Sequence, residues 1–225
     1  MAATKLSRTA TTGNREIATF SAWVKKFSNT EQFLFYNLES ANTNFRIRFN
    51  PEVLQVETLS GGSVVGTLTT TRKFTDIASW YHIVVAINVT LATADDRMKI
   101  YVNGVQETSF SSRTNPPQNQ NMAFNESGHV QYIGAQDSSG FFNGLMTQVI
   151  WVDGTAYPAS TFGSVNATSG EWTPNSSPSV TYGTNGFKLT FEDAVLGDDT
   201  SGNGNDLAMS GSGTPTLDCP SNTFP

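Results

Sequence analysis

Residues 80–89 read WYHIVVAINV and form the most strand-like stretch of the chain. Nearly every residue in it is β-branched or aromatic, which predicts a strand that is covered on both faces and therefore lies inside a sheet. Residues 97–106, RMKIYVNGVQ, follow and place Asn103 and Gly104 between two β-rich runs. Because both turn residues accept a positive φ, the pair predicts a two-residue β-hairpin.

Working outward, residues 17–27, IATFSAWVKKF, alternate with a period of two. This predicts a strand with one buried face, which carries Phe20 and Val24, while Ser21 and Lys25 lie on the other face. Further strands are predicted, in chain order, over residues 32–38, 44–49, 53–59, 64–70, 130–134, 141–152, 187–191 and 206–209.

Two segments depart from the strand pattern. Residues 157–162, YPASTF, predict one helical turn with Pro158 at an early position. Residues 163–182 are rich in Ser, Thr, Pro and Asn and predict an irregular surface crossing. With no helical periodicity and no internal repeat, the pattern predicts a single sandwich domain over residues 1–213. Residues 214–225 are predicted to form an extended C-terminal tail that packs on the body or on a partner.

Composition excludes several classes of protein. The net charge is −6 and the 13 Lys and Arg residues are scattered, so we expect no nucleic acid partner. No apolar run approaches the roughly 20 residues needed to cross a bilayer, so we expect no membrane insertion. The first residues lack the apolar core of a secretory signal, which predicts synthesis in the cytoplasm without a signal peptide. Cys219 is the single cysteine, so no intrachain disulfide can form.

Several short motifs occur in a familiar order. The runs FSAWVK at 20–25, WYHIVV at 80–85 and KIYVNG at 99–104 resemble laminin-G-like jelly rolls, and residues 142–154 are similar to that family's final core strand. The runs YGTNGF and SGNGND, at 182–187 and 201–206, resemble a version frequent in tail and virion proteins of marine bacteriophages. The resemblance spans roughly residues 18–206. It implies an all-β, concanavalin A-like, two-sheet antiparallel jelly-roll sandwich with little helix.

The resemblance also implies a function by analogy. It favours a non-enzymatic bacteriophage virion protein, a capsid decoration or a tail fibre appendage, located at the virion surface. Its partners would be other capsid or tail proteins and further copies of itself, with a trimer as the expected assembly. Since the chain begins near the first predicted strand and ends soon after the module, it reads as a stand-alone accessory protein. The alternative is a lectin-like adhesin that binds a host-surface glycan, and the least favoured function is a glycoside hydrolase.

One loop carries the spacing of a cation site. Residues 198–206, DDTSGNGND, place an oxygen-bearing side chain at every second position. These candidate calcium ligands are Asp199, Ser201, Asn203 and Asn205. Such spacing directs successive oxygens at one hard cation, although the bidentate Glu of a helix–loop–helix site is missing. Glu192 and Asp193 are possible further ligands from a neighbouring strand, and the resemblance raises the expectation of calcium. The alternative is a turn whose side chains cap its own backbone.

Aromatic and histidine residues offer a second set of candidates. Trp151, Trp172 and Tyr157 lie in or near predicted loops, where they could stack on sugar rings. The alternative is that they pack in the core, as aromatic residues commonly do in sandwiches. His82 and His129 are distant in sequence and no Ser or Cys motif accompanies them, which predicts structural histidines.

The carboxylates argue against hydrolysis. Glycosidases of this fold use paired carboxylates that project to one face of a strand. Glu192 and Asp193 are adjacent and would point to opposite faces, and Asp95 and Asp96 lie at a predicted turn. The sequence therefore predicts a protein without a catalytic residue.

Overall fold

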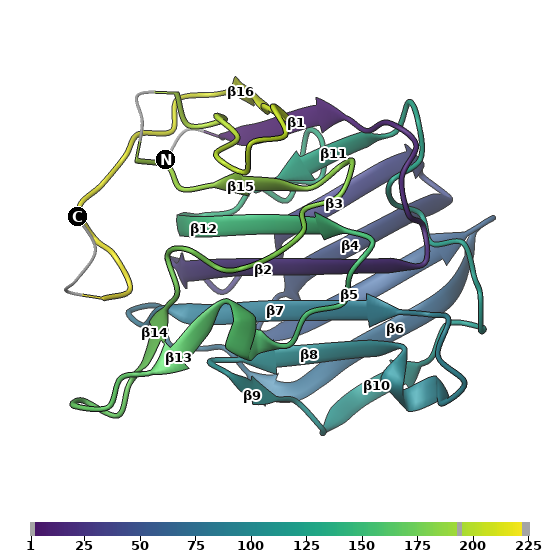
Figure 1. Cartoon of the computed structure of the whole chain (residues 1–225), viewed down its shortest axis with the longest axis horizontal. Coiled ribbons are helices and arrows are strands. Elements are labelled where there is room, and N and C mark those ends of the chain that lie inside the picture. The colour runs from purple at the N-terminus through teal and green to yellow at the C-terminus, as the bar shows by residue number, and fades with distance from the viewer. Residues whose placement is uncertain (1–2, 193–194, 222–225) are drawn as a thin grey trace.

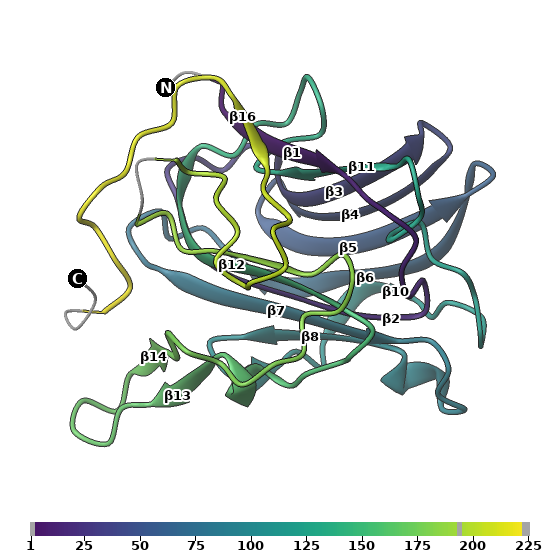
Figure 2. The same cartoon turned by 45° about the horizontal axis from the view of Figure 1, so that its top comes forward.

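The computed structural model describes residues 3–192 and 195–221. Within that part of the chain the helical content is limited to two three-residue 3-10 turns, η1 (Ala94–Asp96) and η2 (Ala159–Thr161). None of the helices in this part has the length and apolar character that a membrane span requires. Two large antiparallel sheets stack face to face, as Figures 1 and 2 show, which confirms the prediction of an all-β jelly-roll sandwich.

Among the described residues, the sheets have eight, six and two strands. The spatial order in the large sheet is β10 (Phe110–Thr114), β6 (Ser63–Lys73), β5 (Val53–Ser60), β4 (Thr43–Asn50), β3 (Gln32–Ser40), β11 (Val130–Ile133), β1 (Lys5–Thr9) and β16 (Ala208–Ser210). The order in the six-stranded sheet is β15 (Phe187–Leu189), β12 (Gly144–Asp153), β2 (Ile17–Lys26), β7 (Tyr81–Asn88), β8 (Met98–Val102) and β9 (Val105–Gln106). The small sheet pairs β13 (Gly163–Val165) with β14 (Trp172–Pro174).

The strand β7 occupies the position that its sequence predicts. It lies between β2 and β8, and its residues 82–87 are all buried. The turn between β8 and β9 has φ values of 48° at Asn103 and 82° at Gly104, which confirms the predicted hairpin.

The main core fills the space between the two large sheets. Its side chains come from alternate positions along the strands and point toward the opposite sheet. Phe20 of β2, Phe35 of β3 and Ile83 of β7 have no exposed area there. Burying one such side chain contributes about 1.5–3 kcal/mol.

The prediction that β2 has one exposed face is wrong. Thr19, Ser21 and Trp23 point away from the main core, and yet their exposed fractions are 0%, 1% and 3%. Residues 155–182 cover this outer face of the six-stranded sheet, as the lower part of Figure 2 shows for β13 and β14. Thr19 Oγ1 donates a hydrogen bond to the carbonyl of Thr155 at 2.8 Å, so the covering segment supplies partners for the polar side chains of β2.

The structure of this covering segment, residues 155–182, differs from a second expectation. Residues 163–182 were predicted as irregular, but they contain the β13–β14 hairpin, whereas η2 confirms the helical turn predicted over 157–162. Periodicity missed two further strands, β1 and β10. Leu6 is the single buried residue in β1, and β10 has none, so neither strand carries an apolar alternation.

The tail predicted over 214–225 is described as far as residue 221. Asp218 contacts the body, where it accepts from Lys25 Nζ at 2.8 Å and from Trp80 Nε1 at 3.0 Å. The neighbouring Leu217 is 96% exposed. The tail is therefore attached to the sandwich through a polar contact, with its apolar side chain left in solvent.

Candidate functional site

The predicted calcium loop is held together by its own hydrogen bonds. Asp199 Oδ1 accepts from the backbone N–H groups of Lys188 and Ser201, both at 2.9 Å. Asp199 Oδ2 accepts from Ser201 Oγ and from the Asn205 backbone N–H, both at 2.8 Å. Each carboxylate oxygen thus has two protein donors. This is the pattern of a carboxylate that organises a turn.

The two asparagines of the loop present nitrogen to the neighbouring carbonyls. The amide nitrogen of Asn203 donates to the carbonyl oxygens of Gly183 and Gly186 at 2.7 and 2.9 Å. Asn205 donates to Gly186 at 2.8 Å, and its Oδ1 accepts from the Arg8 guanidinium at 2.6 Å. In this arrangement the loop does not present a set of free oxygen ligands, because the Asp199 oxygens already accept hydrogen bonds and the two asparagines direct their amide nitrogens toward neighbouring carbonyls. Calcium takes oxygen ligands, so the loop as folded does not fit it. Binding would have to displace these donors, so a calcium site here remains a prediction.

Trp151, the first predicted sugar contact, lies in the core. Its side chain has no exposed area and stacks on Phe35, with ring centroids 4.5 Å apart. Its indole nitrogen donates to Asn125 Oδ1 at 2.9 Å. The prediction of a glycan contact is therefore wrong for Trp151, because β12 directs this ring between the two sheets.

Trp172 attaches the covering segment to the six-stranded sheet through contacts with His82. Its indole nitrogen donates to His82 Nδ1 at 2.9 Å, and His82 lies between Trp172 and Trp23, with ring centroids 6.0 and 4.7 Å away. Ser21 Oγ lies 2.9 Å from His82 Nε2. No serine motif accompanies His82 in the sequence, but the pairing of β2 with β7 brings Ser21 beside it.

This serine–histidine pair cannot act as a nucleophile and its base. The indole N–H only donates, so His82 Nδ1 is unprotonated and the proton of the neutral ring lies on Nε2. Nε2 therefore donates to Ser21 and cannot accept the serine proton. Burial lowers the pKa of His82 from 6.5 to about 3, so the ring stays neutral at physiological pH. The predicted structural role of His82 fits this arrangement.

Tyr157 lines a groove on the outer face of the six-stranded sheet. The groove has a volume of about 270 Å³ and lies between β7, β8 and the start of the covering segment. Its lining residues are Ala86, Asn88, Leu91, Asp96, Lys99, Tyr101, Ala156, Tyr157 and Pro158. Of these, only Tyr157 belonged to the predicted site, because the others come together through strand pairing and through the path of the covering segment.

The groove combines aromatic rings with positioned polar groups. Tyr157 is held by its backbone N–H, which donates to Thr19 Oγ1 at 2.8 Å, and by its hydroxyl, which accepts from the Thr181 N–H at 3.0 Å. Lys99 and Asp96 form an ion pair at 2.9 Å along the same groove. Apolar and aromatic walls with a few fixed polar groups are typical of small-ligand sites.

A larger and more open hollow of about 480 Å³ lies beside Arg8. Its lining residues are Ser7, Arg8, Thr9, Val130, Gly204, Asn205, Asp206 and Ala208, and none of them is aromatic. Arg8 is already bonded to Gln131 at 2.7 Å and to Asn205. Because no aromatic ring lines it, this hollow lacks the aromatic walls of the tyrosine-lined groove and is the weaker candidate for a ligand site.

The acidic residues considered for hydrolysis are engaged elsewhere. Asp95 pairs with Arg113 at 3.1 Å, and Asp96 pairs with Lys99. Glu192 is exposed, whereas Asp193 lies outside the described residues. Among the described acidic residues Asp95, Asp96 and Glu192, there is thus no pair of free carboxylates.

Comparisons with known proteins identify the family. A protein from Bacteroides ovatus assigned to carbohydrate binding shares the fold with a TM-score of 0.56 at 13% identity, covering 93% of this chain and 56% of that one. A heptameric SAP-like pentraxin from Limulus polyphemus has a TM-score of 0.50 at 14% identity, covering 77% and 86%. No curated protein matches the sequence. The family profile Laminin_G_3 matches residues 2–158, so the chain belongs to the concanavalin A-like lectin/glucanases superfamily.

Proposed function

We propose that this protein is a non-enzymatic adhesion module that binds a glycan in the groove between Tyr101 and Tyr157. The observation that carries the proposal is this groove, whose lining includes Tyr101 and Tyr157 together with Asn88 and the Asp96–Lys99 ion pair. Aromatic rings can stack on the apolar face of a sugar while the polar groups bind its hydroxyls. Membership of a lectin-containing superfamily supports the same function.

The direct test is a glycan array, followed by titration of the best glycan. Tyr101→Ala is expected to weaken binding about tenfold, because aromatic contacts add about 0.5–1.5 kcal/mol and 1.4 kcal/mol is tenfold. Trp80→Ala is the matched control, since Trp80 is half-buried and outside the groove. Equal weakening by both variants, or no glycan bound at all, would refute the proposal.

Calcium dependence is tested in the same assay. If the loop at Asp199 binds calcium, EGTA should weaken glycan binding and lower the Tm, and added calcium should restore both. If Asp199 only organises the turn, chelation should change neither quantity. Asp199→Asn distinguishes these cases, because it would remove the calcium response in the first and destabilise the loop without any such response in the second.

We further propose that the module is displayed on a bacteriophage virion, as a capsid decoration or tail appendage. The sequence resemblance of residues 182–187 and 201–206 supports this, together with an open sheet edge. All three residues of the edge strand β16 are exposed, including Met209. An unpaired edge offers backbone groups to another chain. Light scattering would establish whether the protein is the expected trimer, and rebinding to stripped particles would test attachment. Failure to bind any virion component contradicts this role.

A further inference from the structure

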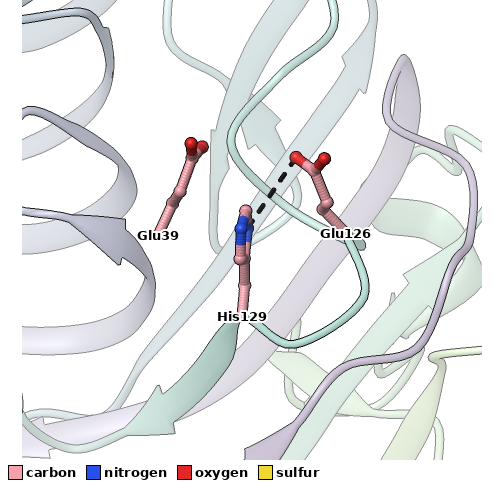
Figure 3. A group of neighbouring side chains, drawn as sticks. All are labelled: Glu39, Glu126 and His129. Atoms are coloured by element: carbon pink, nitrogen blue, oxygen red, sulfur yellow. Dashed lines mark ion pairs between the residues drawn. The ribbon is translucent and has the colours of Figure 1, made fainter.

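Three side chains meet at one end of the eight-stranded sheet, apart from the tyrosine-lined groove. Glu39 comes from β3, and Glu126 and His129 come from the turn that leads into β11 (Figure 3). One potential metal-binding atom from each of the three lies within 4.8 Å of the others.

The backbone explains why they meet. β3 and β11 pair at Leu38 and Val130. Glu39 is the next residue of β3 and His129 immediately precedes β11, so both lie beside this pair. The backbone N–H of His129 donates to the carbonyl of Glu126 at 3.2 Å, which closes a turn and brings Glu126 beside the ring. The convergence is therefore built by strand register and by a tight turn.

The surroundings of the His129 imidazole fit the role of a metal ligand. His129 Nδ1 is buried and has no hydrogen-bond partner among the described residues, and it lies 3.9 Å from Glu126 Oε2. A buried polar atom without a partner is costly, and such atoms are commonly satisfied by a bound water or ion. The Glu39 side chain is exposed and makes no hydrogen bond or ion pair with another described residue.

We propose that Glu39, Glu126 and His129 bind a divalent transition-metal ion of the Zn²⁺ type. An imidazole nitrogen and carboxylate oxygens suit zinc, whereas calcium and magnesium take oxygen ligands. Three protein ligands leave a fourth tetrahedral position open to water or to a group from a bound partner. Rotation of the exposed Glu39 side chain can bring its oxygen closer to the other two ligands.

Arg15 competes with a metal ion for the Glu126 carboxylate. Its guanidinium forms an ion pair with Glu126, and its Nε donates to the carbonyl of Met122 at 3.0 Å. The positive charge on Arg15 competes with a cation for the same carboxylate. Arg15→Gln is therefore expected to strengthen metal binding several-fold.

The test is a titration of the untagged full chain with ZnCl₂ at pH 7.5. Calorimetry measures the binding, and thermal unfolding measures the change in Tm. We expect one equivalent of zinc and a rise in Tm, with loss of both in His129→Ala and at least tenfold weaker binding in Glu39→Gln. The control is Glu171→Gln, an exposed carboxylate outside the cluster that should bind as the wild type does.

Two results would overturn the proposal. One is the absence of zinc binding to the wild-type protein. The other is binding that survives both His129→Ala and Glu39→Gln. A ¹⁵N NMR spectrum of the His129 ring provides a second readout, because zinc bound to the ring should shift its signals.

Discussion

The surroundings of the two histidines differ in almost every respect. His82 is enclosed by Trp23 and Trp172, and both of its ring nitrogens have partners within the protein. His129 lies at the end of the eight-stranded sheet, with its Nδ1 unpartnered among the described residues and with two carboxylates nearby. The comparison teaches that the partners of a histidine, rather than its residue type, separate a structural ring from a candidate ligand.

The largest expected effect is acid sensitivity from His82. The unfolded chain binds a proton on this ring below about pH 6.5, while the folded ring stays neutral down to about pH 3. The unfolded state therefore binds more protons in this window, and stability falls as the pH falls. The loss approaches about 1.4 kcal/mol per pH unit, or about 3 kcal/mol between pH 6.5 and 4. Urea unfolding at a series of pH values measures it.

The control for acid sensitivity is His82→Asn, which lacks the titrating ring and should lose most of this slope. Asp137 and Asp218 also have lowered pKa values, because each accepts a hydrogen bond from a lysine. Their stabilisation is lost mainly below about pH 4, near the ordinary carboxylate pKa, and it is common to both proteins. Equal slopes above pH 4 in the wild type and the variant would contradict the assignment.

The next prediction compares two glycines, one near His82 and one near His129. Gly104 has a φ of 82°, and a Cβ there would lie 2.6 Å from the Trp172 ring. Gly128, in the turn before His129, has a φ of 87° with open space around it. We expect Gly104→Ala to cost about 3 kcal/mol and Gly128→Ala about 1 kcal/mol, since only the first adds a steric clash to the backbone strain. Chemical denaturation measures both, and equal costs would show that Trp172 is not held against the turn.

A smaller effect isolates the hydrogen bond to His82. Trp172→Phe retains an aromatic ring but removes the N–H donor, which should cost about 1–2 kcal/mol. It should also release the His82 tautomer, so that ¹⁵N chemical shifts report protonation at Nδ1 as well as at Nε2. An unchanged tautomer together with unchanged stability would mean that Trp172 does not set the proton position.

The smallest effect is expected at the proposed metal site of Glu39, Glu126 and His129. Glu39→Gln should change the stability of the metal-free protein by less than about 0.5 kcal/mol, because the Glu39 side chain is exposed and has no ion-pair partner among the described residues. Thermal unfolding after dialysis against a chelator measures this. A loss above 1 kcal/mol would show that Glu39 supports the fold itself.

Much of the fold follows from local patterns. The alternation in residues 17–27 placed Phe20 and Val24 in the core, and the Asn103–Gly104 pair marked its hairpin. The candidate site was less accessible to sequence reasoning. Of the three aromatic residues selected, Tyr157 lines the groove, Trp172 holds the covering segment, and Trp151 is buried. Periodicity shows that a face is apolar, but it does not show which segment covers that face.

The sequence by itself determined the fold class, the central position of residues 80–89 and the β8–β9 hairpin, because each depends on neighbouring residues. The tertiary structure decided the rest. It joined Trp172 to His82 across 90 positions, it placed Tyr101 and Tyr157 in the lining of one groove, and it brought Glu39 close to His129. The physical reason is that these contacts depend on strand register and on the path of residues 155–182 over the sheet. No local pattern encodes either of them.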